Sequence, residues 1–261
     1  METADYTPKL ATPATGVVIT GGASGLGYAS ACALAAVGRP VALWDLYADR
    51  AEERAETLAR EYGVKTLGLG VDVRDADAIL DAAEKTRKAL PTIGGLVHCA
   101  GTVDTDGFEG VTPKSWEDGI NVHLRPVVLL TQAFLEDLKG SPGSAIVATS
   151  SINATLGNAI NPIYSAAKGG VLSLVRSMAD GLAPYGIRIN SVSPGQIMTP
   201  MMQPSVNTLP DGYFEKRILL GRIGAPEEIG RVVRFLLSEE ASYITASEIV
   251  VDGGNISSQR G

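Results

Sequence analysis

Short runs of aliphatic and β-branched residues alternate with longer helical patterns along almost the whole chain. The apolar runs are predicted to be strands, at Gly16–Thr20, Pro40–Asp45, Thr66–Val73, Gly95–Cys99, Ser144–Thr149, Ile187–Ser193 and Glu248–Val251. The stretches between them are predicted to be helices, at Leu26–Val37, Ala48–Tyr62, Asp75–Leu90, Ser115–Leu138, Ile163–Leu182 and Pro226–Ser238. Regular alternation of strand and helix predicts a parallel sheet with helices on both faces.

No composition shift, repeat or low-complexity segment marks a boundary between domains. The Pro- and Gly-rich stretches Gly140–Gly143 and Pro194–Pro204 are short enough to be loops. The first fourteen residues have neither a basic start nor an apolar segment, so they are not expected to be a secretory signal. We predict a flexible leader over residues 1–14 and a single domain over residues 15–261.

The charge balance argues against nucleic acid or an anionic membrane as the main partner. The chain carries 29 acidic and 22 basic side chains, a net charge of −7. No apolar run is long enough to span a membrane. The two cysteines, Cys32 and Cys99, are far apart and lie in no motif, which favours free thiols in a reducing compartment. The sequence therefore predicts a cytoplasmic protein.

A glycine-rich turn, TGGASGLG, follows the first predicted strand and begins the first helix. Gly21, Gly25 and Gly27 would let the backbone turn tightly and approach a pyrophosphate at the helix N-terminus. Their G-x-x-x-G-x-G spacing differs from the general G-x-G-x-x-G fingerprint. A purely structural turn is the alternative, but the strand before it and the helix after it favour a dinucleotide site.

Asp45 ends the second predicted strand, 24 residues after Gly21. A carboxylate at this place can accept hydrogen bonds from both hydroxyls of an adenine ribose, and it would repel a 2′-phosphate. Neither Ser24 nor Leu46 offers a positive charge, so the pattern favours NAD over NADP. Arg50 is assigned to a solvated helix face. A solvated loop aspartate is the alternative for Asp45.

Tyr164 and Lys168 are four residues apart in a predicted helix, which places them on one face. A nearby cation favours the phenolate, so we expect Lys168 to lower the pKa of Tyr164. Ser151, thirteen residues before Tyr164, could hydrogen-bond the substrate oxygen that exchanges a proton with Tyr164. Ser150 is the alternative candidate for this role. Such a set can move a proton to or from an alcohol or carbonyl oxygen. A structural tyrosine anchoring a helix is the alternative.

His98 and His123 lack the spacing of metal ligands or of a catalytic triad, and we predict no metal site. Asp104, Asp106 and Glu109 form an acidic stretch that is predicted to be a solvated loop.

Together these motifs resemble the short-chain dehydrogenase/reductase family over nearly the whole chain. The segments SPGQIMTP, GRIGAPEEIG and SYITASEIVVDGG add to the resemblance. It implies an α/β fold: a single Rossmann-like, doubly wound domain with a seven-stranded parallel sheet in the order 3-2-1-4-5-6-7. It also implies a homotetramer.

The resemblance further implies the site residues. The catalytic residues would be Asn121, Ser151, Tyr164 and Lys168, with Asn121 holding a water that links Lys168 to solvent. The cofactor contacts would be Gly21, Ser24, Gly25, Leu26, Gly27, Asp45, Leu46, Asp72, Val73, Cys99, Ala100, Gly101, Tyr164, Lys168, Pro194, Gly195, Ile197 and Thr199. Among these, Asp72 and Val73 would meet the adenine, and Ile197 and Thr199 the nicotinamide carboxamide.

The chain departs from the family pattern at three places. His98 and Cys99 stand where two asparagines are usual, and Cys99 has no amide to brace the fourth strand. Ala246 replaces a usual glycine near a subunit contact. Gly181 interrupts the helix of Tyr164, at a cost of about 1 kcal/mol relative to alanine.

These patterns predict an NAD-dependent oxidoreductase that interconverts a secondary alcohol and a ketone, with Tyr164 as general acid and base. An NADPH-dependent 3-oxoacyl-type ketoreductase and a non-catalytic NAD-binding regulatory protein are the alternatives. The substrate contacts are expected to be Ser151, Asn153, Asn158 and Gln196. A mobile lid is expected over residues 198–217, with Met201, Met202 and Phe214 as its apolar side chains. A medium-sized, largely apolar alcohol with a polar group would suit such a pocket.

Overall fold

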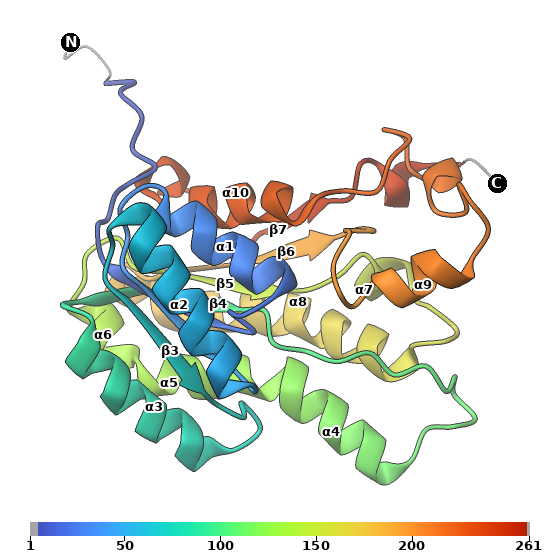
Figure 1. Cartoon of the computed structure of the whole chain (residues 1–261), viewed down its shortest axis with the longest axis horizontal. Helices are drawn as coiled ribbons and strands as arrows, with labels where there is room; N and C mark the ends of the chain where they lie inside the picture. Colours follow the sequence, from blue (N-terminus) through green and yellow to red (C-terminus); the bar gives the residue numbers. More distant parts are fainter. Residues whose placement is uncertain (1–4, 260–261) are drawn as a thin grey trace.

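The computed structural model describes residues 5–259, and its centre is a sheet of seven parallel strands (Figure 1). The strands are β1 Gly16–Thr20, β2 Val41–Asp45, β3 Thr66–Gly70, β4 Ile93–His98, β5 Ala145–Thr149, β6 Arg188–Pro194 and β7 Glu248–Val251. Their order is β3-β2-β1-β4-β5-β6-β7, with every neighbouring pair parallel. This confirms the predicted sheet.

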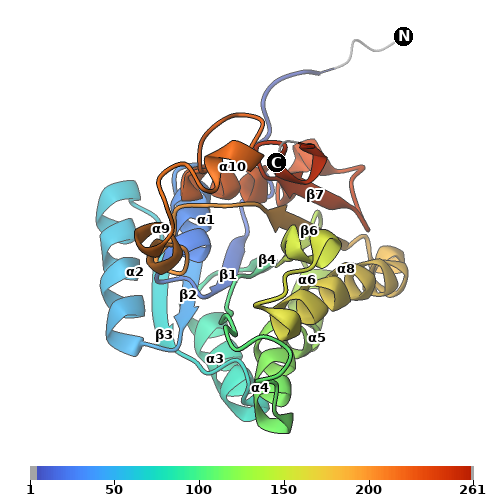
Figure 2. The same ribbon diagram turned by 90° about the vertical axis from the view of Figure 1, so that its right-hand side faces the viewer.

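Helices cover both faces of the sheet (Figure 2). They are α1 Gly25–Ala35, α2 Ala48–Tyr62, α3 Ala76–Ala89, α4 Pro113–His123, α5 Arg125–Ala133, α6 Leu135–Lys139, α7 Asn153–Leu156, α8 Pro162–Leu182, α9 Gln203–Thr208 and α10 Pro226–Leu236. Short 3₁₀ turns add η1 Ala183–Tyr185, η2 Glu215–Arg217, η3 Glu239–Ala241 and η4 Asn255–Ser257. Two separate apolar cores result: one face packs on α1, α2 and α10, and the other on α3, α5 and α8. None of the helices within residues 5–259 is long and apolar enough to cross a membrane.

The single helix predicted over Ser115–Leu138 is wrong, because the chain breaks there into α4, α5 and α6. The first break, at Leu124, follows from Pro126 in the first turn of α5. Proline has no N–H to donate to the carbonyl four residues earlier, so the helical ladder cannot run through this point. The carbonyl left without that donor belongs to Val122, and it lies at the edge of the candidate site.

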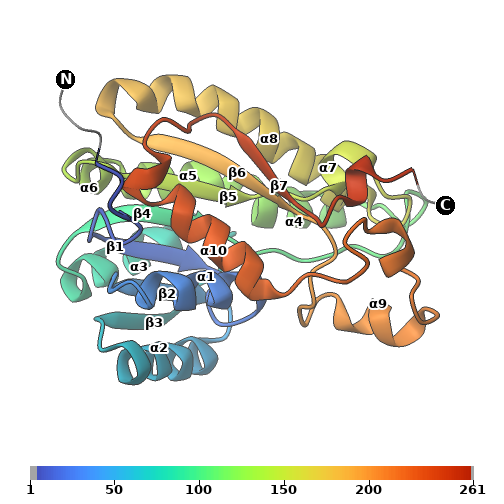
Figure 3. The ribbon, with the colours of Figure 1, turned by 90° about the horizontal axis from the view of Figure 1, so that it is seen from above.

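The strand order reverses direction between β1 and β4, because β1 continues toward α1 on one face while β4 continues toward α4 on the other. The carboxyl ends of these two strands therefore leave a crevice, which is the usual ligand position in such folds. α7 and α9 lie at this same end of the molecule (Figure 3).

The segment before β1 is hydrogen-bonded to the C-terminal part of the domain from Lys9 onward. The amide of Lys9 donates to the Glu240 carboxylate at 2.8 Å, and the amide of Glu239 donates to the Thr12 carbonyl at 2.8 Å. The predicted leader thus includes residues that the structure attaches to the domain, while residues 1–4 lie outside the described residues.

Ala246 adopts a φ of 55°, in the left-handed region that favours glycine. This explains in physical terms why glycine would suit this position, which precedes β7. The Ala246 amide still donates to the Ile189 carbonyl at 2.8 Å, so the turn is held despite the strain. Gly181 is a milder case, because a Cβ added there would meet nothing within 4 Å.

Candidate active site

A cleft of about 460 Å³ opens at the carboxyl ends of the central strands. Most of the predicted cofactor contacts line it: Gly21, Ser24, Gly25, Leu26, Gly27, Asp45, Leu46, Asp72, Val73, Cys99, Ala100, Gly101, Tyr164, Lys168 and Thr199. Pro194, Gly195 and Ile197 are not part of its wall. Gly195 instead donates to the Val251 carbonyl at 3.0 Å, and Ile197 is buried in a short bridge with Gly224.

The glycine turn forms the floor of the cleft, and its glycines serve different purposes. A Cβ on Gly21, whose φ is +64°, would fall 2.9 Å from the Ala100 amide nitrogen, and one on Gly27 would overlap the Gly21 carbonyl. These two glycines allow tight packing. Gly25, with a φ of +50°, faces Thr199 at ordinary contact distance and leaves room beside the turn. Ser24 gives no side-chain cap to α1, so the first-turn amides can receive an anion.

Asp45 is fixed at the edge of the cleft by two backbone amides. Ala23 donates to its Oδ2 at 3.1 Å and Tyr47 to its Oδ1 at 3.3 Å. A carboxylate held in this way can accept hydrogen bonds from a pair of hydroxyls. Arg50 is exposed but also lines the cleft, with its guanidinium 5.0 Å from the centre of the Tyr47 ring. Arg50 thus lies on an exposed helix face, as expected, and the same face borders the cleft.

A second arginine lies at the same end of the cleft. Arg74 forms an ion pair with Asp72 at 2.7 Å, and this pairing lowers the pKa of Asp72. Both residues line the wall next to Val73. The Asp72 carboxylate is thus paired with Arg74 and is not a free acceptor for the predicted adenine contact. This end of the cleft contains three acidic side chains, including Asp118, which lies 3.7 Å from Arg74, and two basic ones.

Tyr164 and Lys168 both project from α8 into the cleft, with the Lys168 ammonium 5.5 Å from the centre of the Tyr164 ring. The ammonium donates to the Thr149 carbonyl at 2.6 Å, at the end of β5. Burial lowers the pKa of Lys168 to about 8. The hydrogen bond of the ammonium is thus made to a backbone carbonyl rather than to the phenol oxygen.

The pKa of Tyr164 is raised above its ordinary value, contrary to the expectation from the Tyr–Lys spacing. Burial is the cause, and the Ser151 hydroxyl acts in the opposite direction. Ser151 follows β5 and is buried, and it accepts a hydrogen bond from the Asn153 amide at 3.2 Å. Its rival Ser150 donates to the Lys168 carbonyl at 2.9 Å and so braces the helix. The geometry favours Ser151 over Ser150 beside the phenol.

The structure does not bring Asn121 to the cleft. Its side-chain oxygen accepts a hydrogen bond from Arg125 at 3.2 Å on an exposed part of the α4–α5 junction. His123, at the last position of α4, lines the cleft instead. Its ring meets the Tyr164 ring edge to face, with centroids 5.2 Å apart. The two-residue difference places Asn121 and His123 on different faces of the helix.

His123 is neutral and only partly hydrogen-bonded. Its Nε2 lies 2.8 Å from the Thr102 carbonyl and 3.3 Å from the Thr102 amide nitrogen, and the shorter contact, to a group that can only accept, favours a proton on Nε2. Its Nδ1 is buried and has no hydrogen-bond partner among the described residues. Burial and the charge of Lys168 lower the pKa of His123 to about 2.

His98 supplies the brace for β4 that was expected to be lost. Its Nε2 donates to the Val122 carbonyl at 3.1 Å, the group that Pro126 leaves free, and its Nδ1 accepts from the Thr20 hydroxyl at 2.8 Å. Burial lowers the pKa of His98 to about 3. This link between β1, β4 and α4 was missed because the sequence shows no contact between its members. Within residues 5–259, no group of three or more His, Cys, Asp or Glu side chains could hold a metal.

The residues predicted to meet the substrate are dispersed. Asn153 and Asn158 do not line the cleft, and the Asn158 side chain accepts from the Ile160 amide at 3.0 Å within a turn. Gln196 lines a separate cavity of about 480 Å³ with Leu219 and Leu220. Of the predicted lid side chains, Met201 lines the cleft, and Phe214 packs edge to face on Tyr213. Nearness in sequence to Ser151 or to Pro194 and Gly195 therefore did not identify residues that line the cleft.

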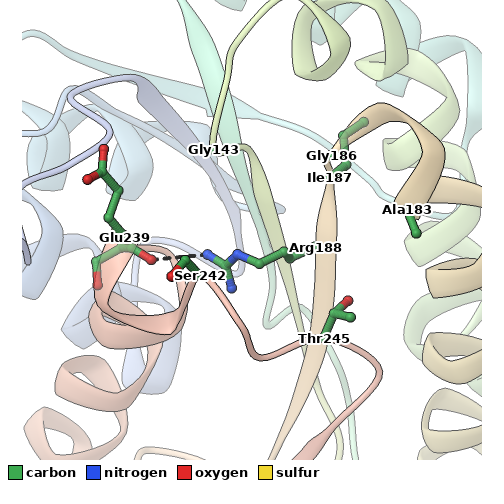
Figure 4. Close-up of a pocket in the computed structure, with 9 residues that line it drawn as sticks. Gly143, Ala183, Gly186, Ile187, Arg188, Glu239, Ser242 and Thr245 are labelled. Atoms are coloured by element: carbon green, nitrogen blue, oxygen red, sulfur yellow. Dashed lines mark hydrogen bonds between the residues drawn. The ribbon is translucent and has the colours of Figure 1, made fainter. Parts of the chain in front are cut away.

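A third cavity, of about 350 Å³, lies at the opposite end of the sheet, where the strands β5 and β6 begin (Figure 4). Arg188 lines it and donates to the carbonyls of Ser238 and Ile244, each at 3.1 Å. Arg39 is buried nearby in the same manner, on the carbonyls of Thr15 and Leu237. Both guanidinium groups thus tie backbone segments together, which is a structural task.

Comparison with known proteins places this geometry in a family. Residues 21–255 match the family described as enoyl-(acyl carrier protein) reductase. A curated relative, 3-oxoacyl-(acyl-carrier-protein) reductase FabG of Aquifex aeolicus, is 35% identical over 91% of this chain and 95% of its own length. Cyclopentanol dehydrogenase of Comamonas testosteroni is 33% identical over 91% of this chain and 95% of its own.

Solved structures agree with the fold. Levodione reductase superposes with a TM-score of 0.87 at 31% identity, over 94% of this chain and 98% of that one. L-sorbose reductase from Gluconobacter frateurii, complexed with NADPH and L-sorbose, superposes with a TM-score of 0.87 at 28% identity, over 93% of this chain and 96% of that one. Fold and site together define a Rossmann-type oxidoreductase. The chain belongs to the short-chain dehydrogenase/reductase family.

Proposed function

We propose that the protein is an NAD-dependent oxidoreductase that interconverts a secondary alcohol and a ketone. The observation that carries this proposal is one cleft that contains Tyr164 and Lys168 at one end and Asp45 at the other. The residues present fit a dinucleotide: a glycine turn with room beside Gly25, uncapped amides at the start of α1, and a fixed carboxylate for the ribose. The bound nicotinamide would supply the hydride acceptor or donor.

The protein's own residues supply the proton chemistry. Tyr164 accepts the hydroxyl proton when an alcohol is oxidised, and donates a proton to the carbonyl oxygen when a ketone is reduced. Ser151 hydrogen-bonds the same substrate oxygen and stabilises charge that develops there. Lys168 holds the nicotinamide ribose with a donor that the Thr149 carbonyl leaves free. Burial raises the pKa of Tyr164, so ligand binding would have to lower it for the phenol to accept a proton in oxidation.

A second candidate, an NADPH-dependent ketoreductase, is favoured by Arg50. Its guanidinium lines the cleft near Asp45, where a 2′-phosphate would lie. FabG is a reductase of acyl-carrier-protein substrates, and it is among the relatives. The Asp45 carboxylate opposes a phosphate at the same place, and for this reason NAD is our first choice.

The segment over residues 198–217 supports a largely apolar substrate. Met201 lines the cleft, while Met198, Leu209 and Tyr213 are partly exposed along the same segment. Methionine adapts to ligands of varied shape. We assign this segment the role of a lid over a medium-sized alcohol with one polar group. For the whole protein we propose a cytoplasmic homotetramer, for which β7 offers a free sheet edge with Val250 exposed.

The experiment is a panel of secondary alcohols and ketones followed by NADH absorbance, with both NAD(H) and NADP(H). The Tyr164→Phe variant is expected to lose turnover by roughly 10²- to 10⁴-fold, the range of general acid–base catalysis. NADH titration by fluorescence should give unchanged binding, since the phenyl ring keeps the packing against His123. Unchanged turnover in this variant would refute the mechanism. Tight cofactor binding without turnover of any panel member would favour the regulatory alternative.

A further inference from the structure

The catalytic helix α8 has no cap of its own. Its N-cap residue, Asn161, makes no side-chain bond to the first turn, and Pro162 has no N–H. The amides of Ile163 and Tyr164 are therefore the donors that need partners from elsewhere. Unpaired donors at a helix start leave the first turn poorly fixed, and Tyr164 is in this turn.

Asp104 supplies both acceptors from a distant part of the chain. The Tyr164 amide donates to its Oδ1 at 3.0 Å, and the Ile163 amide donates to its Oδ2 at 3.2 Å. The Asn161 side-chain amide in turn donates to the Asp104 carbonyl. The expectation that Asp104 belongs to a solvated loop is thus wrong, although Asp106 and Glu109 are exposed.

Asp104 also connects α8 to the wall of the cofactor cleft. Residues 99–102, which follow β4, form part of that wall, and Asp104 lies two residues further on. The same loop is attached once more where the Gly107 amide donates to the Ile160 carbonyl at 3.2 Å. A carboxylate at the N-terminus of a helix also interacts favourably with the helix dipole. These hydrogen bonds therefore fix the start of α8 relative to the wall of the cleft.

We propose that Asp104 is a positioning residue, which fixes the backbone of Tyr164 relative to the cofactor wall so that the phenol meets the substrate oxygen. This inference rests on the proposed oxidoreductase function. It assigns to Asp104 no contact with substrate or cofactor. The side chain acts through Tyr164, whose backbone it binds directly.

The test compares Asp104→Ala with Asp104→Asn and with a control, Asp106→Ala. Asp106 is two residues away, is exposed, and its carboxylate forms no hydrogen bond or ion pair within the described residues. Asp104→Ala removes both acceptors, and a small displacement of a catalytic group can cost up to 10²-fold. We expect kcat to fall roughly tenfold or more, while NADH binding by fluorescence and the cofactor KM change less than about twofold.

The asparagine variant keeps one acceptor oxygen for the Tyr164 amide. It should recover kcat to within about threefold of the parent, whereas Asp106→Ala should match the parent. Turnover is normalised to the NADH-binding fraction, so a loss of folded protein does not imitate a loss of positioning. If Asp104→Ala does not fold, Asp104→Asn carries the comparison at a smaller amplitude. Parent-like kcat in folded Asp104→Ala would overturn the proposal, and where only Asp104→Asn folds, a kcat equal to that of the parent within error would do so.

A second readout does not depend on turnover. With ¹³C-labelled tyrosine, the Tyr164 ring resonance is assigned by its absence in Tyr164→Phe. It should shift or broaden in Asp104→Ala, and hydrogen exchange at the start of α8 should become faster, with neither change in Asp106→Ala. An unperturbed Tyr164 resonance would overturn the proposal even if the parent turns over substrate. If the parent turns over no substrate but the Tyr164 resonance is perturbed in Asp104→Ala, the contact is supported and the proposed function is refuted.

Discussion

The ring of His123 lies perpendicular to the ring of Tyr164, with an interplanar angle of 89° and centroids 5.2 Å apart. This packing needs Gly101, because a Cβ there would fall 2.7 Å from the His123 Nδ1. Burial, and after it the charge of Lys168, lowers the pKa of His123, so the packed ring is neutral. Protonation of His123 would place a charge in this buried ring contact. His98 is equally buried, and burial lowers its pKa as well.

Acid should destabilise the protein through these two histidines. Their pKa values are about 2 and about 3 in the folded state, against about 6.5 in an unfolded chain. The unfolded chain therefore takes up protons first, and the free energy of unfolding falls as pH falls from about 6.5 toward 3. The slope is on the order of 1 kcal/mol per pH unit for each histidine. Urea unfolding at several pH values measures it.

The control for this prediction is His98→Asn, alone and combined with His123→Asn. Asparagine can bridge a donor and an acceptor without titrating, so the slope should become smaller with each change. An equal slope in the parent and the double variant would show that carboxylates alone produce the acid sensitivity.

Lys168→Met should stabilise the protein at pH 7 while abolishing turnover. The folded-state pKa of about 8 lies below the ordinary value of 10.5, so the buried charge opposes folding below pH 8. The gain should be on the order of 1 kcal/mol, because methionine leaves the Thr149 carbonyl unpaired. It should narrow as pH rises above 8, where folded Lys168 loses its charge.

Thermal unfolding at pH 7 and pH 9.5 would measure this difference. Lys88→Met is the matched control, since Lys88 is exposed on α3 and should change Tm little. A gain that is independent of pH would indicate better packing rather than relief of a buried charge.

Ala246→Gly should stabilise the domain by about 0.5–1 kcal/mol. Glycine relieves the strain of a φ of 55°, and part of the gain is offset by its greater freedom in the unfolded chain. Gly186→Ala is the reciprocal control. Gly186 has a φ of +71°, and no atom lies within 4 Å of an added Cβ, so strain alone should lower stability there. Chemical denaturation that gave both changes the same sign would contradict the explanation.

Cofactor choice should depend on Asp45 and Arg50 in opposite ways. Asp45→Ala removes a ribose acceptor and a repulsive charge, so the ratio of kcat/KM for NADP over NAD should rise by roughly tenfold or more. Adding Arg50→Ala should remove most of that rise if the guanidinium binds the phosphate. A double-mutant cycle with both cofactors measures the coupling. An unchanged ratio on adding Arg50→Ala would mean that Arg50 only packs on Tyr47.

Alternation of apolar runs and helical patterns predicted each strand to within a few residues, because buried parallel strands have a strong local signature. The sheet order came from the resemblance, not from periodicity. The break before α5 was missed, although Pro126 signals it by removing one N–H from the helical ladder. Strand and helix content is local information, which explains this success.

Contacts between distant segments were not predictable in the same way. Asp104 and Tyr164 are 60 positions apart, and no local pattern relates them. The choice between Asn121 and His123 depended on which face of α4 meets the cleft, which only packing determines. The sign of the Tyr164 pKa shift depended on burial, since the i, i+4 spacing gives proximity to Lys168 but not desolvation.

Arg39 has a consequence for handling this protein. By binding the carbonyls of Thr15 and Leu237, it fixes the entry of the chain at the amino edge of the sheet, away from the cleft. The last described turn, η4, instead lies at the end where the strands finish (Figure 1). A fusion partner or a surface attachment at the amino terminus should therefore lie away from the strand ends that form the cleft, whereas one at the carboxyl terminus would lie at the same end of the sheet as the cleft.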